Sequence, residues 1–357
     1  MAIHVAFPSI EQFRTVVKNV RDRANYHGQP LPKLKFKGTV KLHGTNASVV
    51  KDVASGEFWA QSRNNVITVD ADNAGFARFV QDHRDEFDEL ISISRTVVGQ
   101  ENIHVGDKVV IYGEWCGQGI QSGVAISQMP KAFVIFAIKL ARDDEKSVWF
   151  TADQLVAIAD RYGEEHAQEH RIFNIQKFPS WEVEIDFARP EQIQNDLIAL
   201  TQAVEQECPV GKAFGHSGIG EGIVWQCMSV WNVPAVDADT FAIRTGDLIF
   251  KVKGEKHSDT KVKKLAAVDV EKINSIKEFV GSVVTDHRLS KGIDFLMEGR
   301  AEALESKDTP AFLKWVGADV LKEESDTIDA SGFDRKEIMP EVNRAARQWF
   351  LEKVNKV

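Results

Sequence analysis

Two patterns of hydrophobic and polar residues divide the chain near residue 258. From about residue 35 to residue 255, short apolar or alternating runs dominate, and such runs are typical of β-strands. We expect strands in the segments ASVVKD, EFWAQSR, KVVIYGEW, AFVIFAIKL, GIVWQCM and DLIFKVKG. Helical spacing interrupts these runs over residues 73–90, 151–163 and 190–207. Strands and helices mixed in this order favour an α+β fold over a regular βαβ repeat.

Helices are expected at both ends of the chain. Ser9 and Gln12 form a capping-box pattern at the start of a helix over residues 9–20. After residue 258 the strand signal fades, and an OB barrel, which needs five strands, is not predicted there. Apolar residues instead recur at helical spacing over 269–284, 309–321 and 341–354. We therefore expect a first domain at residues 1–258 and an all-α domain at residues 259–357.

Composition is that of an ordinary globular protein, with 43% hydrophobic and 27% charged residues among 357. The net charge of −9 argues against uniform coating of nucleic acid or anionic membrane, but it allows a local basic channel. Cys116, Cys208 and Cys227 form no CxxC pair, which fits a reducing cytoplasm. We see no signal peptide and no apolar stretch of the ~20 residues that a membrane helix needs.

Five strand-associated stretches contain charged residues in otherwise apolar surroundings. They are KLHGTN with Lys41 and His43, SRNN with Arg63, YGEWCG with Glu114, GIGEGIVW with Glu221, and IFKVK with Lys251 and Lys253. Each one alone is typical of a solvated face, a turn or a surface ion pair. Their occurrence together, and in this order, is what indicates a shared site.

Strand geometry strengthens the case for a shared site at the stretch IFKVK. Lys251 and Lys253 alternate with Phe250 and Val252, so both lysines share one face of the strand. Two ammonium groups on one face repel each other unless an anion lies beside them, and a phosphate would meet that need. Lys41 would share a face with the histidine two residues later if its strand continued that far.

The order of these stretches resembles the signature motifs of the covalent nucleotidyltransferases, the superfamily of ATP-dependent ligases and mRNA capping enzymes. KLHGTN is similar to the lysine–glycine motif of RNA ligases in the bacteriophage nick-sealing and trypanosome editing branch. DNA ligases more often have an acidic residue where His43 lies and Arg where Asn46 lies. SRNN, YGEWCG, FVIFAI, EGIVW and FKVKG resemble the successive motifs of the same family, over about residues 35–255.

The resemblance implies a nucleotidyltransferase domain with ATP-grasp-like antiparallel sheets and flanking helices, followed by an all-α domain. It also implies that Lys41 attacks the α-phosphate of ATP, expels pyrophosphate and becomes a lysyl-AMP. A free lysine amine is mostly protonated at neutral pH, because its pKa is ~10.4. Partial burial and the positive charge of Lys251 and Lys253 would favour the neutral amine. We therefore expect Lys41 to be tolerated inside the domain because it is partly neutral.

The resemblance gives further residues a role with the nucleotide and with Mg²⁺ (or Mn²⁺). Glu114 and Glu221 would hold the metal or the ribose hydroxyls. Asn46 would orient a metal-bound water or the ribose, Arg63 would clamp a phosphate, and Phe136 would stack on adenine. The implied nucleotide-binding set is Val40, Leu42, Asn46, Arg63, Glu114, Phe136, Glu221, Lys251 and Lys253.

Two positions near these residues are less settled. His43 would act in pyrophosphate release or in transfer of AMP to the RNA. Ala137 stands after Phe136, where the family often has an acid, so no contact is expected from that position.

The predicted function is an ATP-dependent RNA ligase that joins 5′-phosphate and 3′-hydroxyl ends through lysyl-AMP and adenylylated RNA. We expect an RNA partner that is duplex or nicked, no membrane partner, and a cytoplasmic monomer. The lysines expected to extend toward the RNA backbone are Lys251, Lys253, Lys256, Lys261, Lys263 and Lys264. A DNA ligase or a capping guanylyltransferase is the alternative within the superfamily. A catalytically inactive nucleic-acid-binding module is the alternative outside it, but binding alone would not need Lys41, Glu114 and Glu221 together.

One further motif points to other chemistry. HAQEH, residues 166–170, matches the H-x-x-E-H pattern of inverted zinc proteases and would place both histidines on one helix face. Its surroundings, RYGEEHAQEHR, are polar throughout and favour a solvated helix or loop. No P-loop is present, and the glycine-rich stretches lack the strand–turn–helix context of a Rossmann fingerprint.

Overall fold

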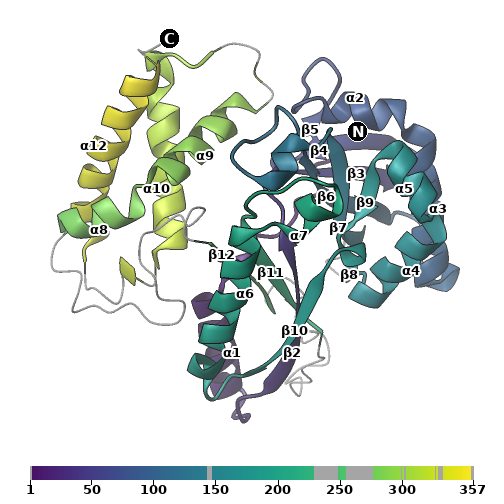
Figure 1. Ribbon diagram of the computed structural model, residues 1–357, viewed down its shortest axis with the longest axis horizontal. Helices are drawn as coiled ribbons and strands as arrows, with labels where there is room; N and C mark the ends of the chain where they lie inside the picture. Colours follow the sequence, from purple (N-terminus) through teal and green to yellow (C-terminus); the bar gives the residue numbers. More distant parts are fainter. Residues whose placement is uncertain are drawn as a thin grey trace. The chain divides into compact units, whose positions relative to one another are not determined.

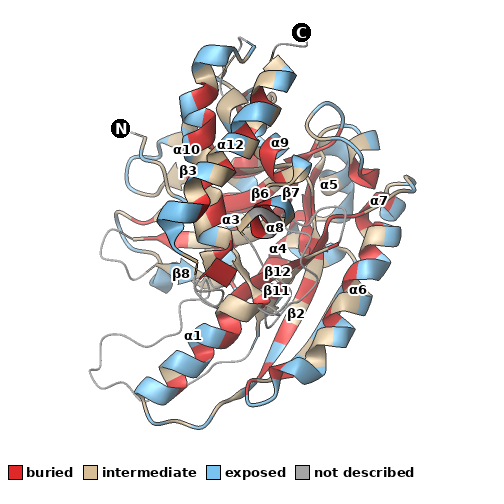
Figure 2. Ribbon diagram, turned by 90° about the vertical axis from the view of Figure 1, so that its left-hand side faces the viewer, coloured by how far each residue is buried: buried red, intermediate tan, exposed pale blue. Residues whose placement is uncertain are grey.

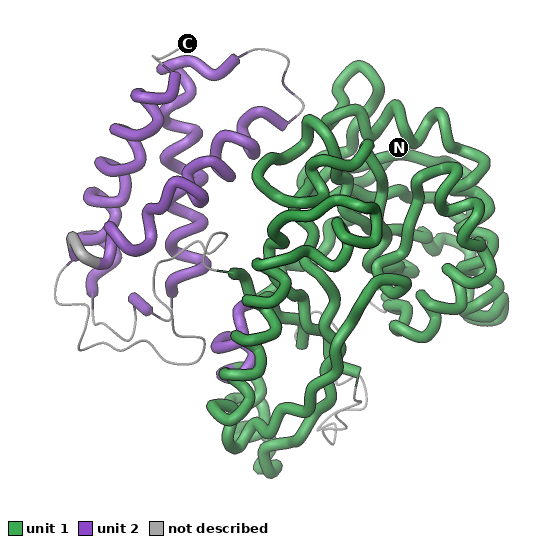
Figure 3. Tube along the Cα trace, in the orientation of Figure 1, with its two compact units in different colours: residues 1–11, 19–254 green, residues 12–18, 255–357 purple. Residues whose placement is uncertain are grey.

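The computed structural model describes residues 2–142, 147–228, 248–254, 276–298, 300, 303–325, 327–328 and 333–354. Contacts divide the chain into two compact units (Figure 3), residues 1–11 with 19–254, and residues 12–18 with 255–357. The expected boundary between residues 258 and 259 lies outside the described residues. Residues 12–18, which we expected in the first domain, group with the second unit. The division at residue 258 stays a prediction.

The first unit mixes strands and helices (Figure 1). Its longer strands are β2 (Lys33–Lys41), β3 (Thr45–Asp52), β4 (Phe58–Ser62), β6 (Lys108–Cys116), β7 (Ala132–Ala141), β10 (Ser180–Asp186), β11 (Gly222–Cys227) and β12 (Ile249–Lys253). Its shorter strands are β5 (Val66–Ile67), β8 (Val148–Trp149) and β9 (Ile172–Asn174). Its helices are α2 (Phe76–Asp82), α3 (Arg84–Val98), α4 (Ala152–Tyr162), α5 (Glu164–His170), α6 (Gln194–Gln206) and α7 (Pro209–Ala213). The two-residue strand β1 (Glu11–Gln12) and helix α1 (Phe13–Tyr26) span the junction of the two units.

One sheet has five strands in the order β1-β12-β11-β2-β10. The β2–β10, β2–β11 and β11–β12 pairs are antiparallel. One face of this sheet is apolar, because Phe36 and Phe250 are fully buried and their rings contact each other at 5.4 Å. Trp225 lies over Gly38 on the same face, where a Cβ would come within 2.7 Å of the indole, so a glycine is required there. Alternation puts the side chain of Lys41 on the opposite face.

The other sheet has seven strands in the order β5-β4-β3-β6-β7-β8, with β9 parallel to β7. Its remaining pairs are antiparallel. One face packs against α2, α3 and α4 in a core that includes Phe87, Ile111 and Trp115. Because side chains alternate along β6, Tyr112 and Glu114 point to the opposite face. The N-terminal segment contacts that opposite face, since the hydroxyl of Tyr112 donates to the backbone oxygen of Val5 at 3.0 Å.

The second unit is helical in its described part. Its helices are α8 (Ile276–Val283), α9 (Asp286–Met297), α10 (Thr309–Glu323) and α12 (Arg335–Val354). Their core includes Phe279, Phe312, Val316, Val342 and Phe350. The stripes expected over 309–321 and 341–354 supply much of that core, whereas Ile273 lies outside the described residues.

Two predicted helices have different bounds in the structure. The N-terminal helix starts at Phe13 rather than near Ser9, because Glu11–Gln12 form a strand of the five-stranded sheet. It ends at Tyr26, two residues before Gly28, whose φ of 61° is easily adopted by glycine. Figure 2 shows buried residues along one side of α1 and exposed residues along the other.

The single helix predicted over residues 73–90 is two helices, α2 and α3, that meet at His83. The ring nitrogen Nδ1 of His83 lies 2.9 Å from the backbone oxygen of Phe79, which gives the last turn of α2 a side-chain partner. Apolar spacing continues across the break, so periodicity alone could not reveal it. The helix expected over 190–207 is confirmed, except that its first turn, Pro190–Ile193, is 3₁₀.

Candidate active site

Antiparallel pairing brings three distant segments together at one end of the five-stranded sheet. Gly222, the first residue of β11, is paired with Lys41 on β2 and with Lys253 on β12. Glu221 immediately precedes that glycine. The pairing therefore makes neighbours of Lys41, Glu221 and Lys253.

Glu221 is the centre of this group. Its Oε2 atom lies 2.7 Å from Nζ of Lys41 and 3.3 Å from Nδ1 of His43. Its Oε1 atom lies 3.5 Å from Nζ of Lys253. The carboxylate of Glu221 is 2% exposed, the Lys253 side chain 8% and the Lys41 side chain 21%. The group is thus mostly buried, with the amine of Lys41 the more accessible of the two lysines.

The charge state of Glu221 follows from these neighbours. Burial raises the pKa of its carboxyl, but the ammonium groups of Lys41 and Lys253 and the hydrogen bond from His43 lower it by more. The net result is a pKa well below the usual range of a glutamate. Glu221 is therefore a firmly ionised carboxylate in the interior.

Gly222 fixes the position of this carboxylate. Its φ of 152° lies in the region that favours glycine, and a Cβ there would meet the backbone oxygen of Val252 at 2.2 Å. The backbone oxygen of Glu221 accepts a hydrogen bond from Gly254 at 3.0 Å. A residue with a side chain after Glu221 would separate β11 from β12 and displace the carboxylate.

Glu114 comes from the seven-stranded sheet and approaches the same group. It lies directly across from Asn46 in the β3–β6 pair, so both side chains share a face. Its Oε1 atom accepts a hydrogen bond from the backbone N–H of Gly44 at 2.8 Å. Gly44 is required because a Cβ there would lie 2.3 Å from the backbone oxygen of Trp115. The turn after Lys41 is thereby held against β6.

Burial raises the pKa of Glu114, and the negative charge of Glu221 raises it further. Lys41, the Gly44 N–H and His43 offset only part of this effect. The turn over Lys41–Gly44 contacts both acids, since Lys41 and His43 reach Glu221 and the N–H of Gly44 reaches Glu114, so the two sheets bring their carboxylates to a common site. One buried acid, one half-buried acid and two lysines at one place are an arrangement suited to phosphate and metal chemistry.

Lys41 has a partner that the sequence did not reveal, because its amine lies 2.7 Å from the carboxylate of Glu221. The expected effect of Lys251 and Lys253 on the charge of this amine stays a prediction. His43 differs from its conditional expectation, because β2 ends at Lys41 and His43 reaches Glu221 from the turn that follows.

The structure also shows where Lys251, Lys253 and Arg63 lie. Lys251 and Lys253 share one face of β12, and Phe250 and Val252 are buried on the other, as the alternation predicted. Arg63 follows β4 in a bend between β4 and β5.

Val40 and Leu42 are 3% and 6% exposed. Val40 lies on the apolar face of β2, with its side chain in the core.

Phe136 lies at an irregularity of the seven-stranded sheet. Tyr112 pairs with Ala137 and Gly113 with Ile135, so Phe136 is an extra residue in β7, a β-bulge. Its ring contacts Phe7 edge-on at 5.0 Å. The contribution of the segment Val5–Phe7 to this face could not be read from the sequence, although Phe7 is an apolar residue placed before the first helix.

The lysines expected to continue toward RNA, Lys256, Lys261, Lys263 and Lys264, lie outside the described residues. None of the helices in the described part of the chain combines the length and the apolar composition needed to cross a bilayer.

Comparison with known families shows the family of the chain. The profile of the RNA ligase family matches residues 35–253, more than half of the chain. The chain belongs to the RNA ligase family. The matched region begins within β2 and ends at Lys253, so it contains the candidate site residues from Val40 to Lys253. The segment around Phe7 and the lysines after residue 253 lie outside it. The narrower bacteriophage and trypanosome branch stays a prediction.

Solved structures of a Naegleria gruberi RNA ligase resemble the chain more distantly. A lysine-to-methionine mutant with AMP and Mn is 14% identical, with a TM-score of 0.42, and covers 72% of this chain and 58% of its own. The same ligase with PPi is 14% identical, with a TM-score of 0.41 and coverages of 72% and 58%. The chain thus spans less than two thirds of these structures. A search of curated proteins gave no match.

Proposed function

We propose that this member of the RNA ligase family is an ATP-dependent ligase that joins RNA ends through an adenylate bound covalently to Lys41. The observation that supports this most is the cluster of Lys41, Glu221 and Lys253 at adjoining strand ends. A nucleophilic amine needs to be fixed beside cations that stabilise phosphate charge, and this cluster has both features.

The reaction has three group transfers. The ammonium of Lys41 first releases a proton to solvent, and Nζ forms a bond to the α-phosphorus of ATP while the bond to pyrophosphate breaks and pyrophosphate leaves. An oxygen of the RNA 5′-phosphate then attacks the phosphorus of the bound AMP, and the bond to Nζ breaks. Finally, the RNA 3′-hydroxyl attacks the 5′-phosphate, AMP leaves, and a phosphodiester bond joins the two ends.

Lys41 must leave Glu221 before it can attack. In the present state its amine is 2.7 Å from that carboxylate. Nucleotide binding would bring phosphate oxygens that compete for the cations around Glu221. Lys253, and Lys251 on the same strand face, then offset the negative charge of the reacting phosphate. His43, which also contacts Glu221, is placed to assist departure of pyrophosphate or transfer of AMP.

The residues present fit a divalent cation such as Mg²⁺ or Mn²⁺. Both ions prefer oxygen ligands, and Glu114 and Glu221 supply carboxylates from the two sheets. The raised pKa of Glu114 agrees with this, because burial and the charge of Glu221 disfavour its charged form, which a bound cation would stabilise. The bound ion would neutralise charge on the triphosphate. Asn46, opposite Glu114, would orient its water or the ribose.

Further residues would complete the nucleotide site. Arg63 would clamp a phosphate, and Phe136, re-aimed by the β-bulge, would stack on adenine. Val40 and Leu42 would contribute through the backbone around Lys41. These roles come from the resemblance of the motifs and define which variants are worth making.

Self-labelling tests the proposal. The protein is incubated with α-labelled ATP and Mg²⁺ and resolved on a denaturing gel. We expect label on the wild type and none on Lys41→Ala. Label that survives in Lys41→Ala would refute the role of Lys41. Omission of the metal should remove the label from the wild type.

Ligation assays test the RNA substrate separately. We expect joining of RNA with a 5′-phosphate and a 3′-hydroxyl, at a nick in a duplex in preference to free single strands. RNA with a 5′-hydroxyl should remain unjoined. Joining of DNA nicks but not of RNA nicks, by a protein that labels itself normally, would contradict the proposed substrate.

A further inference from the structure

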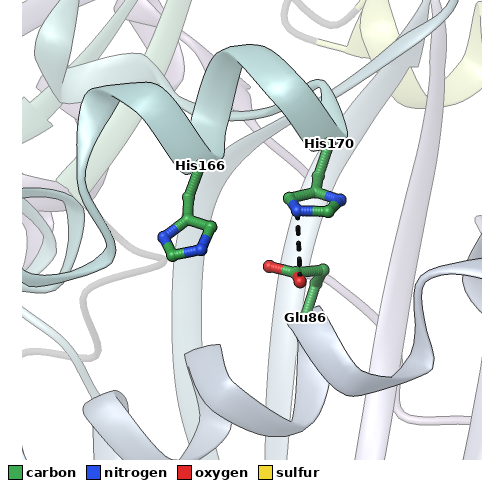
Figure 4. A group of neighbouring side chains, drawn as sticks. All are labelled: Glu86, His166 and His170. Carbon is green, nitrogen blue, oxygen red and sulfur yellow. Dashed lines mark ion pairs between the residues drawn. The ribbon is translucent and has the colours of Figure 1, made fainter.

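A group of metal-ligating side chains lies outside the proposed ligase site. His166 and His170 are one turn apart on α5, and Glu86 comes from α3, 80 residues earlier in the chain (Figure 4). Each residue offers one ligand atom, and these atoms all lie within 4.8 Å of one another. Residues at i and i+4 on a helix point to the same side, which lets both histidines face one ion.

Hydrogen bonds leave suitable ligand atoms available. The Nδ1 atom of His166 lies 3.2 Å from the backbone oxygen of Tyr162, and a carbonyl only accepts, so Nδ1 bears the proton. The Nε2 atom of a neutral His166 ring is then unprotonated and can bind a metal. Metal-binding histidines generally donate their second nitrogen to a carbonyl in this way.

Tyr162 also orients Glu86. Its hydroxyl donates to Oε2 of Glu86 at 2.9 Å, while Oε1 of Glu86 faces Nε2 of His170 at 3.2 Å. The carboxylate of Glu86 is thereby held with one oxygen on Tyr162 and the other toward α5.

An ion pair between Glu86 and His170 is the simpler explanation, but it accounts for two of the three residues. The ring of His166 lies 5.8 Å from the ring of His170 at an angle of 26°, although His166 is an exposed residue. Two histidines and one carboxylate around a common point match the ligands that zinc uses in three-ligand sites, with water as the fourth ligand. Ligand atoms of a tetrahedral zinc site are roughly 3.4 Å apart, given bonds of about 2.0–2.1 Å. Small side-chain rotations would close the observed spacing.

We propose that Glu86, His166 and His170 bind a zinc ion that joins α3 to α5, with one coordination position open to water. This site is distinct from the ligase site. Helices α3 and α4 pack on the face of the seven-stranded sheet that contains Trp115, whereas Glu114 points to the opposite face. The proposal therefore does not depend on the proposed function.

Zinc binding to the full chain tests this inference. The protein is freed of metal with a chelator and titrated with zinc by calorimetry, alongside His166→Ala, His170→Ala and Glu86→Gln. We expect one zinc ion per wild-type chain, with an affinity at least about 10-fold weaker in each variant. His104→Ala, which removes an exposed histidine elsewhere, should bind zinc like the wild type. His43→Ala should also do so, because its histidine belongs to the other site.

Two further measurements keep the test decisive. Zinc should raise the midpoint of thermal unfolding of the wild type and leave that of His166→Ala unchanged, since a ligand that binds the folded state stabilises it. Cobalt should give the visible absorption of a tetrahedral nitrogen and oxygen site, without the thiolate bands that a site at the cysteines would show. Absence of binding at micromolar zinc, unchanged binding in the His166→Ala, His170→Ala double variant, or thiolate bands would each overturn the proposal.

Discussion

Glu221 is buried and Glu114 is half-buried at one site, and their pKa values move in opposite directions. Glu221 has basic side chains from Lys41, His43 and Lys253 within 3.5 Å of its oxygens. Glu114 accepts a backbone hydrogen bond from Gly44 and feels the negative charge of Glu221. The difference shows that close basic side chains outweigh the effect of burial on the pKa of Glu221, whereas at Glu114 the effect of burial is larger.

The comparison also separates two roles. Glu221 is neutralised by the chain's own lysines and orients the amine of Lys41. Glu114 lacks comparable compensation in the described contacts, and so it is the better candidate to receive a divalent cation. Variants of Glu221, Lys253 and Glu114 alter one side of this contrast at a time.

The largest effect is expected from Glu221→Gln. Loss of this charge leaves Lys41 and Lys253 buried beside each other, which should cost roughly 3 kcal/mol of unfolding free energy and abolish self-labelling. Denaturant titration and the labelling gel measure the two effects. Glu207→Gln is the matched control, because Glu207 pairs with Lys212 at 2.9 Å on the surface, and it should change stability by less than about 1 kcal/mol. Equal losses in both variants would contradict the central place of Glu221.

Lys253→Ala comes next. It removes one of the cations that offset phosphate charge, and the rate of self-labelling should fall about 10²-fold. Lys256→Ala is the comparison, and a much smaller loss is expected from it. Single-turnover labelling at saturating ATP measures both rates. A loss in Lys256→Ala as large as that in Lys253→Ala would remove the support for the strand-face argument.

Glu114→Gln should separate stability from activity. Because burial penalises its charge, the amide should leave the free energy of unfolding at neutral pH unchanged or raise it by about 1 kcal/mol. Labelling should fall at least about 10-fold, and more Mn²⁺ should restore part of it. A large loss of stability would show that Glu114 is structurally paired like Glu221.

The pH dependence of stability provides the smallest and most specific contrast. The pKa of Glu221 is lowered on folding, so its stabilisation is present above the unfolded value of about 4.3 and is lost as pH falls below it. The pKa of Glu114 is raised on folding, so its protonated form stabilises the folded protein below the unfolded pKa of about 4.3. That stabilisation is lost as the pH rises through the pKa of Glu114 in the folded protein.

These signs can be read from two difference curves. The unfolding free energy of the wild type minus that of Glu221→Gln should decrease toward acid pH. The unfolding free energy of the wild type minus that of Glu114→Gln should become less favourable to the wild type as pH rises. Chemical unfolding across this range gives both curves. Slopes of the same sign would contradict the opposite environments of the two acids.

Strand patterns made much of the first unit predictable. Alternation identified β3, β4, β6, β7, β11 and β12, and it placed Lys251 and Lys253 on one face. Strand β10 was missed although Trp181, Val183 and Ile185 alternate with acids, because an exposed edge strand gives a weak apolar signal.

Long-range pairing could not be read from local pattern. The contact between Lys41 and Glu221 joins residues 180 apart, and no spacing rule connects them. The same holds for Glu86 and His170: the polar stretch HAQEH indicated a solvated helix, and only the fold brings α3 beside it. Both candidate sites combine a motif visible in the sequence with a carboxylate supplied from elsewhere.

The central claim is that Nζ of Lys41 forms the covalent bond to adenylate. Peptide mass mapping after incubation with ATP and Mg²⁺ tests it most directly, with Lys41→Arg as the variant that keeps the charge beside Glu221. We predict one AMP adduct, on the peptide that contains Lys41, and no adduct in Lys41→Arg despite normal folding. An adduct on another lysine, or one that persists in Lys41→Arg, would contradict the account.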